Sequence, residues 1–144
     1  MIKLDSICVF CGSREGNDQK IIDVASELGH SLAENDITLI YGAAKIGIMG
    51  LVANAALSKK GSVIGIIPEF LKLKEVVHLG LSELIVTENM HERKMLMQDK
   101  SDGFITLPGG IGTFEELFEI LTWLQLGLHS KPIGLLNVNH YYDD

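Results

Sequence analysis

Short apolar runs alternate along this chain with longer segments in which apolar residues recur at helical spacing. The short runs predict strands at Ser6–Phe10, Thr38–Tyr41, Ser62–Ile67, Glu83–Thr87, Gly103–Leu107 and Ile133–Asn137. The longer patterns predict helices over about Gln19–Glu34, Ile48–Lys59, Met90–Lys100 and Thr113–Leu126, with room for a short helix in Glu69–Gly80. Several strands are apolar almost throughout, which is typical of strands covered on both faces.

This alternation predicts βαβ units and therefore an α/β fold: a Rossmann-like doubly wound, mainly parallel sheet with helices on both faces. A length of 144 residues suits one domain, residues 1–144. Few residues follow the last predicted strand, whereas a doubly wound fold usually covers that strand with a helix. We expect that a C-terminal helix is either lacking or lies beyond this sequence.

Charge and hydropathy argue against two classes of partner. The formal net charge is −7, and the two arginines, Arg14 and Arg93, stand among scattered lysines, so a polymeric nucleic acid is not expected. No apolar run approaches the roughly 20 residues of a membrane span, and the N-terminus leads directly into a strand rather than a signal peptide. We expect a cytoplasmic protein that does not contact membranes.

Cys8 and Cys11 form a C-x-x-C pattern. A redox dithiol of the thioredoxin type sits at a helix N-terminus, whereas Cys8 lies inside a predicted strand. A structural zinc ion needs four ligands, and the sequence has no second cysteine pair. We interpret the two residues as reduced, partly buried thiols and expect no metal site.

Four loops follow predicted strands, and in a parallel sheet such loops share the edge where ligands bind. The first carries Gly12 and Ser13, which allow close backbone approach and offer a hydroxyl, or which form an ordinary turn. The second, Tyr41–Gly50, contains Gly42 and leads into a helix whose N-terminus favours an anion. It lacks the Gly-Lys-Ser/Thr of a P-loop.

The third loop runs into a helix that Asn89 can cap. Arg93 and Lys94 then fall in the first turns, where cations oppose the helix dipole by a few tenths to about 1 kcal/mol. A bound anion would explain the placement, and a solvated basic pair is the alternative. We expect His91 to lie at the surface or behind the site rather than to act as a catalyst.

The fourth loop, Pro108–Glu116, places three glycines at a helix start, which is a phosphate-binding pattern. It is not the G-x-G-x-x-G fingerprint of dinucleotide enzymes, because Glu115 occupies the third glycine position; this disfavours an NAD-dependent enzyme. Thr113 and Glu116 have the spacing of a capping box, in which Glu116 would bond the Thr113 N–H. The alternative is a carboxylate that works on a sugar beside the bound phosphate.

Four segments together resemble the Lonely Guy (LOG) family. They are Pro108–Glu116, which reads P-G-G-x-G-T-x-x-E, Met90–Lys94, Thr122–Gly127 and Lys131–Asn137. The similarity extends from about Ile7 to Tyr142. Several motifs that occur in the same order are more specific than any one glycine loop.

The resemblance implies a cytokinin riboside 5'-monophosphate phosphoribohydrolase, which releases an adenine-type base and ribose 5-phosphate from AMP or N6-prenylated AMP. By the same resemblance Arg93 and Glu116 form the catalytic pair, and no cofactor is required. Together with the loop chemistry, it gives these expected substrate-binding residues: Gly12, Ser13, Gly42, Glu75, Lys94, Gly109, Gly110, Ile111, Gly112, Thr113 and Thr122. The family implies a homodimer, whose interface could use the apolar Leu121–Leu128 region; burial in the core would explain those residues equally well.

Two points qualify the resemblance. The family's second loop usually has three consecutive glycines, whereas this chain has Gly42-Ala43-Ala44, and we expect the two methyl groups to narrow the approach of a ligand. Family members have often been labelled lysine decarboxylases, but no pyridoxal phosphate site is evident. The competing function is a non-catalytic nucleotide or molybdenum-cofactor carrier on the same fold, which would have no need of the Glu116 carboxylate.

Overall fold

The computed structural model describes residues 4–12, 18–72, 77–109 and 111–138. The elements in this part of the chain are, in order, β1 (Ser6–Phe10), α1 (Gln19–Glu34), β2 (Thr38–Tyr41), α2 (Gly47–Ser58), β3 (Val63–Pro68), α3 (Glu69–Lys72), β4 (Glu83–Thr87), α4 (Met90–Lys100), β5 (Gly103–Thr106), α5 (Ile111–Gln125) and β6 (Ile133–Leu135). Every predicted strand and helix is present, with shifted ends for some.

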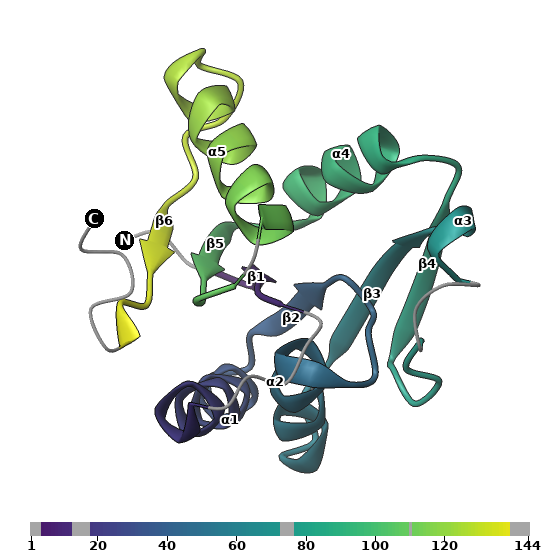
Figure 1. Ribbon diagram of the computed structural model, residues 1–144, viewed down its shortest axis with the longest axis vertical. Coiled ribbons are helices and arrows are strands. Elements are labelled where there is room, and N and C mark those ends of the chain that lie inside the picture. Colours follow the sequence, from purple (N-terminus) through teal and green to yellow (C-terminus); the bar gives the residue numbers. More distant parts are fainter. Residues whose placement is uncertain (1–3, 13–17, 73–76, 110, 139–144) are drawn as a thin grey trace.

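The strands form one sheet in the order β4-β3-β2-β1-β5-β6, and every neighbouring pair is parallel (Figure 1). The predicted Rossmann-like sheet is thereby confirmed. From β1 the chain builds outward to β4 on one side and then crosses to β5 on the other. The crevice between the ends of β1 and β5 is the switch point at which open α/β sheets bind ligands.

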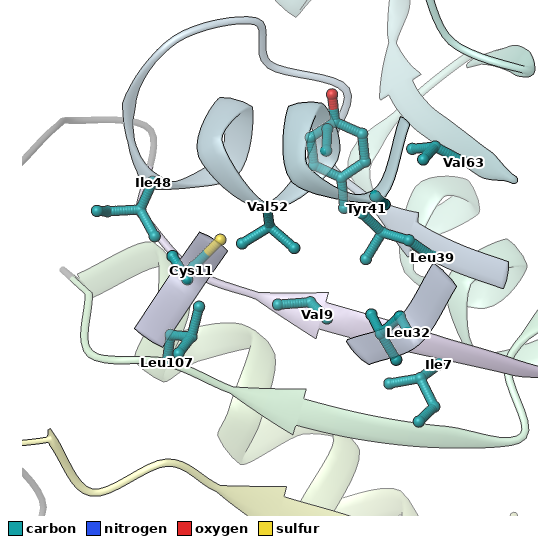
Figure 2. Close-up of a cluster of buried hydrophobic side chains, with 13 residues drawn as sticks. Ile7, Val9, Cys11, Leu32, Leu39, Tyr41, Ile48, Val52, Val63 and Leu107 are labelled. Carbon is teal, nitrogen blue, oxygen red and sulfur yellow. The ribbon is translucent and has the colours of Figure 1, made fainter. Parts of the chain in front are cut away.

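Helices α1 and α2 cover one face of the sheet, and α4 and α5 cover the other (Figure 1). Side chains alternate along β1, so that Ile7 and Val9 join the core under α1 and α2, whereas Cys8 and Phe10 join the core under α4 and α5. Figure 2 shows the first of these clusters. A hydrophobic layer on each face explains why the strand sequences are apolar almost throughout.

Cys8 and Cys11 are both free and buried, on opposite faces of the sheet. Figure 2 shows Cys11 in the cluster with Ile48 and Leu107. Burial raises the pKa of both thiols, and the negative charge of Glu116 raises it further. The two cysteines are therefore protonated core residues, and the interpretation as reduced, buried thiols is confirmed.

Two predicted boundaries are wrong by two residues, and the first is the start of α5, which lies at Ile111 rather than Thr113. Strand β6 ends at Leu135 instead of Asn137. The chain turns after this strand, because the N–H of Val138 donates to the carbonyl of Leu136 at 3.0 Å. Within the described ranges, no helix combines the length and apolar character that a membrane crossing requires.

Candidate functional site

The loops after the strands meet at one edge of the sheet, as predicted. The N–H of Met49, in the first turn of α2, donates to the carbonyl of Gly12 at 3.1 Å. The guanidinium of Arg93 reaches from α4 to the carbonyl of Gly42 after β2. Glu116 of α5 lies close enough to Cys11, at the end of β1, for its charge to influence that thiol. Loops distant in sequence are therefore in contact around the switch point.

Arg93 is buried, with 5% of its surface exposed. Its Nε donates to the carbonyl of Ile66 at 2.9 Å and its Nη2 to the carbonyl of Gly42 at 2.9 Å, while Nη1 points at the sulfur of Met90. Among the described residues it has no carboxylate partner. A buried cation without a counterion is unfavourable, and a guanidinium has five N–H donors, so Arg93 is able to receive an anion.

The position of the Arg93 side chain requires a glycine at residue 42. A Cβ added at Gly42 would overlap Nη2 of Arg93 and would come within 3.1 Å of the Met49 sulfur. The backbone of Gly42 does not have a positive φ, so the constraint is space rather than conformation. From the sequence we expected Gly42 to allow close approach of a ligand to the backbone. In the structure, the space that a side chain at residue 42 would occupy is filled by Arg93.

The rest of the second loop corrects a sequence expectation. Ala43 and Ala44 are 0% and 1% exposed, so their methyl groups point into the protein and cannot narrow a ligand's approach. The Tyr41 hydroxyl donates to the carbonyl of Ala44 at 2.8 Å, and the N–H of His78 donates to that of Ala43 at 2.9 Å. These bonds hold Ala43 at a left-handed φ of 72°, which costs a residue with a Cβ roughly 1–2 kcal/mol.

Glu116 does not cap α5. A capping box needs Thr113 at the residue before the helix, but Thr113 is the third helical residue and is 4% exposed beside Gly109. Glu116 is the sixth helical residue, a full turn beyond the position of a capping carboxylate. The capping interpretation is wrong, because the glycine-rich loop enters the helix two residues earlier than the apolar pattern indicates.

Glu116 is one of six residues around a water-sized, apolar space of about 10 Å³ between α4 and α5. The other five residues that line it are Phe10 from β1, Lys94 and Met97 from α4, and Glu119 and Ile120 from α5. The sequence did not single out Phe10, Met97 and Ile120, since an apolar residue that lines a cavity has the same pattern as one in the core. Glu116, which is half-buried, thus lies near the end of β1.

Lys94 is engaged by two carboxylates of α5. Its Nζ donates to Glu115 and, at 2.7 Å, to Glu119. Burial by itself would lower the pKa of Lys94, but the hydrogen bonds and charges of Glu115 and Glu119 outweigh it and raise the pKa. The lysine is a charged link between α4 and α5.

Thr122 lies on a different face of α5 from Glu116. Six residues separate them, which is a rotation of about 240° on a helix with 3.6 residues per turn. Thr122 is exposed, and its hydroxyl donates to the carbonyl of Phe118, whose side chain is 60% exposed. Of the α5 residues predicted to contact substrate, Thr122 is therefore not brought to the cavity.

The other predicted residues fall into two groups. Asn89 caps α4 as expected, since its Oδ1 accepts the N–H of Glu92 at 2.8 Å, and His91 is exposed. Ser13, Glu75 and Gly110 lie outside the described residues. In the ranges that the structure describes, there is no cluster of three His, Cys, Asp or Glu side chains that could hold a metal ion.

Comparison with known proteins places this chain among enzymes. A family model described as "Possible lysine decarboxylase" matches residues 49–144. The chain is 51% identical over 138 residues to the cytokinin riboside 5'-monophosphate phosphoribohydrolase of Rhodococcoides fascians, covering 95% of this chain and 70% of that protein. It is 49% identical over 137 residues to the corresponding enzyme LOG2 of Arabidopsis thaliana, covering 95% of this chain and 64% of LOG2.

Solved structures show the same fold in proteins of another kind. The molybdenum cofactor binding protein of Rippkaea orientalis is 25% identical, with a TM-score of 0.74 over 94% of this chain and 77% of that one. The Moco carrier protein of Chlamydomonas reinhardtii is 22% identical, with a TM-score of 0.75 over 93% of this chain and 76% of its own. At this identity the second likeness concerns the fold alone.

Proposed function

Because this chain belongs to the Lonely Guy (LOG) family, we propose that it hydrolyses the N-glycosidic bond of a nucleoside 5'-monophosphate, AMP or N6-prenylated AMP, to free base and ribose 5-phosphate. The observation that carries the proposal is the position of Glu116: it is half-buried, and it lies at the switch point, where its charge reaches Cys11 at the end of β1. A carrier would have no need of such a group.

The substrate phosphate would bind at the start of α5. The backbone N–H groups of Ile111, Gly112 and Thr113 belong to the first turn of this helix, where N–H groups have no intrahelical acceptor. The helix dipole adds to their attraction for an anion. Arg93, which is buried and has no carboxylate partner in the part of the chain that the structure describes, supplies a formal positive charge from α4 on the same edge.

Glu116 would perform the chemistry. Cleavage of the base–ribose bond builds positive charge on the ribose ring, and a carboxylate close to that ring stabilises the charge. The same carboxylate can take a proton from the attacking water. The phosphate serves as the remote handle whose binding energy positions the ribose for the reaction. Each role requires the carboxylate to be ionised and directed at the sugar.

The phosphate handle leads to a prediction about ligands. AMP should bind at least about 10²-fold more tightly than adenosine, because two or more charge-assisted hydrogen bonds contribute about 1.5–3 kcal/mol each. Isothermal calorimetry with both compounds measures the difference, and only AMP should yield free base. Equal affinities would mean that the glycine loop is merely a turn, and the proposed phosphate site would then be wrong.

We also propose that the chain forms a homodimer through the exposed apolar side of α5. Phe118, Leu121 and Leu124 are 60%, 38% and 38% exposed, and Leu126 and Leu128 continue the same surface beyond the helix. Burial in this chain's own core does not account for them. An exposed apolar patch of this kind is typical of an interaction surface.

Light scattering at micromolar concentration should therefore report twice the 15.8 kDa mass of one chain. Leu121→Glu should shift the mass toward the monomer, because a charge buried in an apolar interface is unfavourable. Glu27→Gln, on the exposed part of α1, is the control and should leave the mass unchanged. A wild-type chain that remains monomeric would contradict this assembly.

A further inference from the structure

Most of the hydrogen-bond donors of the Lys94 ammonium group are used in bonds to other residues of the same chain. An ammonium group has three N–H donors, and Glu115 and Glu119 accept two of them. The two glutamates are four residues apart and so project from the same side of α5. The Lys94 side chain is only 17% exposed, which is the exposure of a group enclosed by its partners rather than one that extends to solvent.

The charge around Lys94 is unsuited to a phosphate. Glu115, Glu116 and Glu119 lie within five consecutive residues of α5 beside it, and together with the lysine they give a formal net charge of −2. A phosphate dianion placed against Nζ would be attracted by one positive charge and repelled by the adjacent carboxylates at similar distances. By contrast, the guanidinium of Arg93 bonds neutral groups, the carbonyls of Ile66 and Gly42, and the start of α5 offers N–H groups without an intrahelical acceptor.

The same ion pairs have a mechanical consequence. Glu116 directly follows Glu115, so the direction of its side chain depends on how α5 is rotated about its axis. Leu117 and Ile120 hold the buried side of α5, whereas a glycine-rich loop precedes the helix and its outer face is exposed. Lys94 joins α4 to α5 at the wall of the cavity that Glu116 lines. The link resists rotation at the turn where the carboxylate must be aimed.

We propose that Lys94 is a positioning residue, which fixes the turn of α5 that carries Glu116 through its ion pairs with Glu115 and Glu119 and does not hold the substrate phosphate. This inference rests on the proposed hydrolysis, because it assigns the lysine a part in that reaction. It replaces the phosphate-binding role that the family resemblance had implied for Lys94.

Two variants separate positioning from phosphate binding. Lys94→Met removes the charge and both ion pairs, whereas the double variant Glu115→Gln/Glu119→Gln removes the ion pairs and keeps the lysine. Both should lower kcat for base release from AMP by about tenfold or more, since small misplacements of a reacting group are expensive, and leave KM within about threefold. Lys94→Arg, which can keep both pairs, should retain kcat.

A charge-reversed triple variant, Lys94→Glu with Glu115→Lys and Glu119→Lys, restores attraction between the helices and should recover kcat relative to Lys94→Met. Thermal unfolding of every variant confirms that the protein is folded. The inference is overturned if Lys94→Met raises the KM for AMP by about tenfold while the double glutamine variant keeps wild-type kcat, because the lysine would then be a phosphate ligand.

Calorimetry with AMP keeps this test separate from that of the proposed function. A wild-type chain that binds AMP but releases no base contradicts the hydrolase proposal. In that case an unchanged AMP affinity in Lys94→Met still supports the exclusion of Lys94 from the phosphate site, and a loss of about tenfold contradicts it.

Discussion

Replacing Glu116 by glutamine should abolish base release from AMP while the fold survives. Glutamine has nearly the same shape, but it lacks the negative charge that would stabilise the ribosyl cation and the basic oxygen that would activate water. We expect turnover to fall by at least about 10²-fold, in the range usual for a positioned acid–base group. AMP affinity should persist or rise, because one charge that repels the phosphate is gone.

Steady-state kinetics, calorimetry with AMP and thermal unfolding measure these three quantities. Glu27→Gln makes the same chemical change at an exposed position of α1 and should leave turnover and stability unchanged. If Glu116→Gln turned over AMP at the wild-type rate, the catalytic carboxylate would have to be another residue.

The second large effect is expected from Gly42→Ala. The backbone conformation of Gly42 is open to alanine, but the added methyl group would occupy the position of Arg93 Nη2. Arg93 would lose its bond to Gly42 and shift from the carbonyl of Ile66. Hydrogen bonds from charged groups contribute about 1.5–3 kcal/mol each, so AMP turnover should fall by about 10²-fold.

A double-mutant cycle with Arg93→Ala shows whether this loss acts through the arginine. If it does, Gly42→Ala should cost little in a chain that already lacks Arg93, and the two losses should be strongly non-additive. Kinetics and unfolding of the two single variants and the double variant measure the coupling. Fully additive losses would mean that the methyl group disturbs the site by a route independent of Arg93.

The sequence predicted the sheet well because its signal is local. Apolar runs of strand length between helical patterns define βα units, and the parallel connection then brings the loops at Gly12 and Gly42 to one edge whatever their side chains do. Arg93 could also be placed on that edge. Asn89 marks the start of its helix, and this start follows a parallel strand.

Contacts between elements could not be predicted in the same way. Arg93 donates to the main-chain carbonyls of Ile66 and Gly42. Every residue has such a carbonyl, so the residue types do not reveal which carbonyls the arginine bonds. The pairing of Lys94 with Glu115 and Glu119 depends on which faces of α4 and α5 meet. Periodicity shows that each helix has a buried side but does not fix its rotation against its neighbour.

The misplaced start of α5 had the greatest effect on the interpretation of the site. Thr113 and Glu116 satisfy the capping pattern, and glycine is a poor helix former, so the sequence favoured a start at Thr113. The helix instead includes Ile111 and Gly112. This shift of two residues removes the capping-box explanation for Glu116.

The carrier alternative and the hydrolase share the fold, and they differ in what happens to the bound ligand. The most direct measurement is therefore to incubate the chain with AMP and with N6-isopentenyl AMP and to quantify free base and ribose 5-phosphate over time. We expect both products to appear in equal amounts, with turnover far beyond one per chain. Nucleotide that binds tightly and is recovered intact would contradict it.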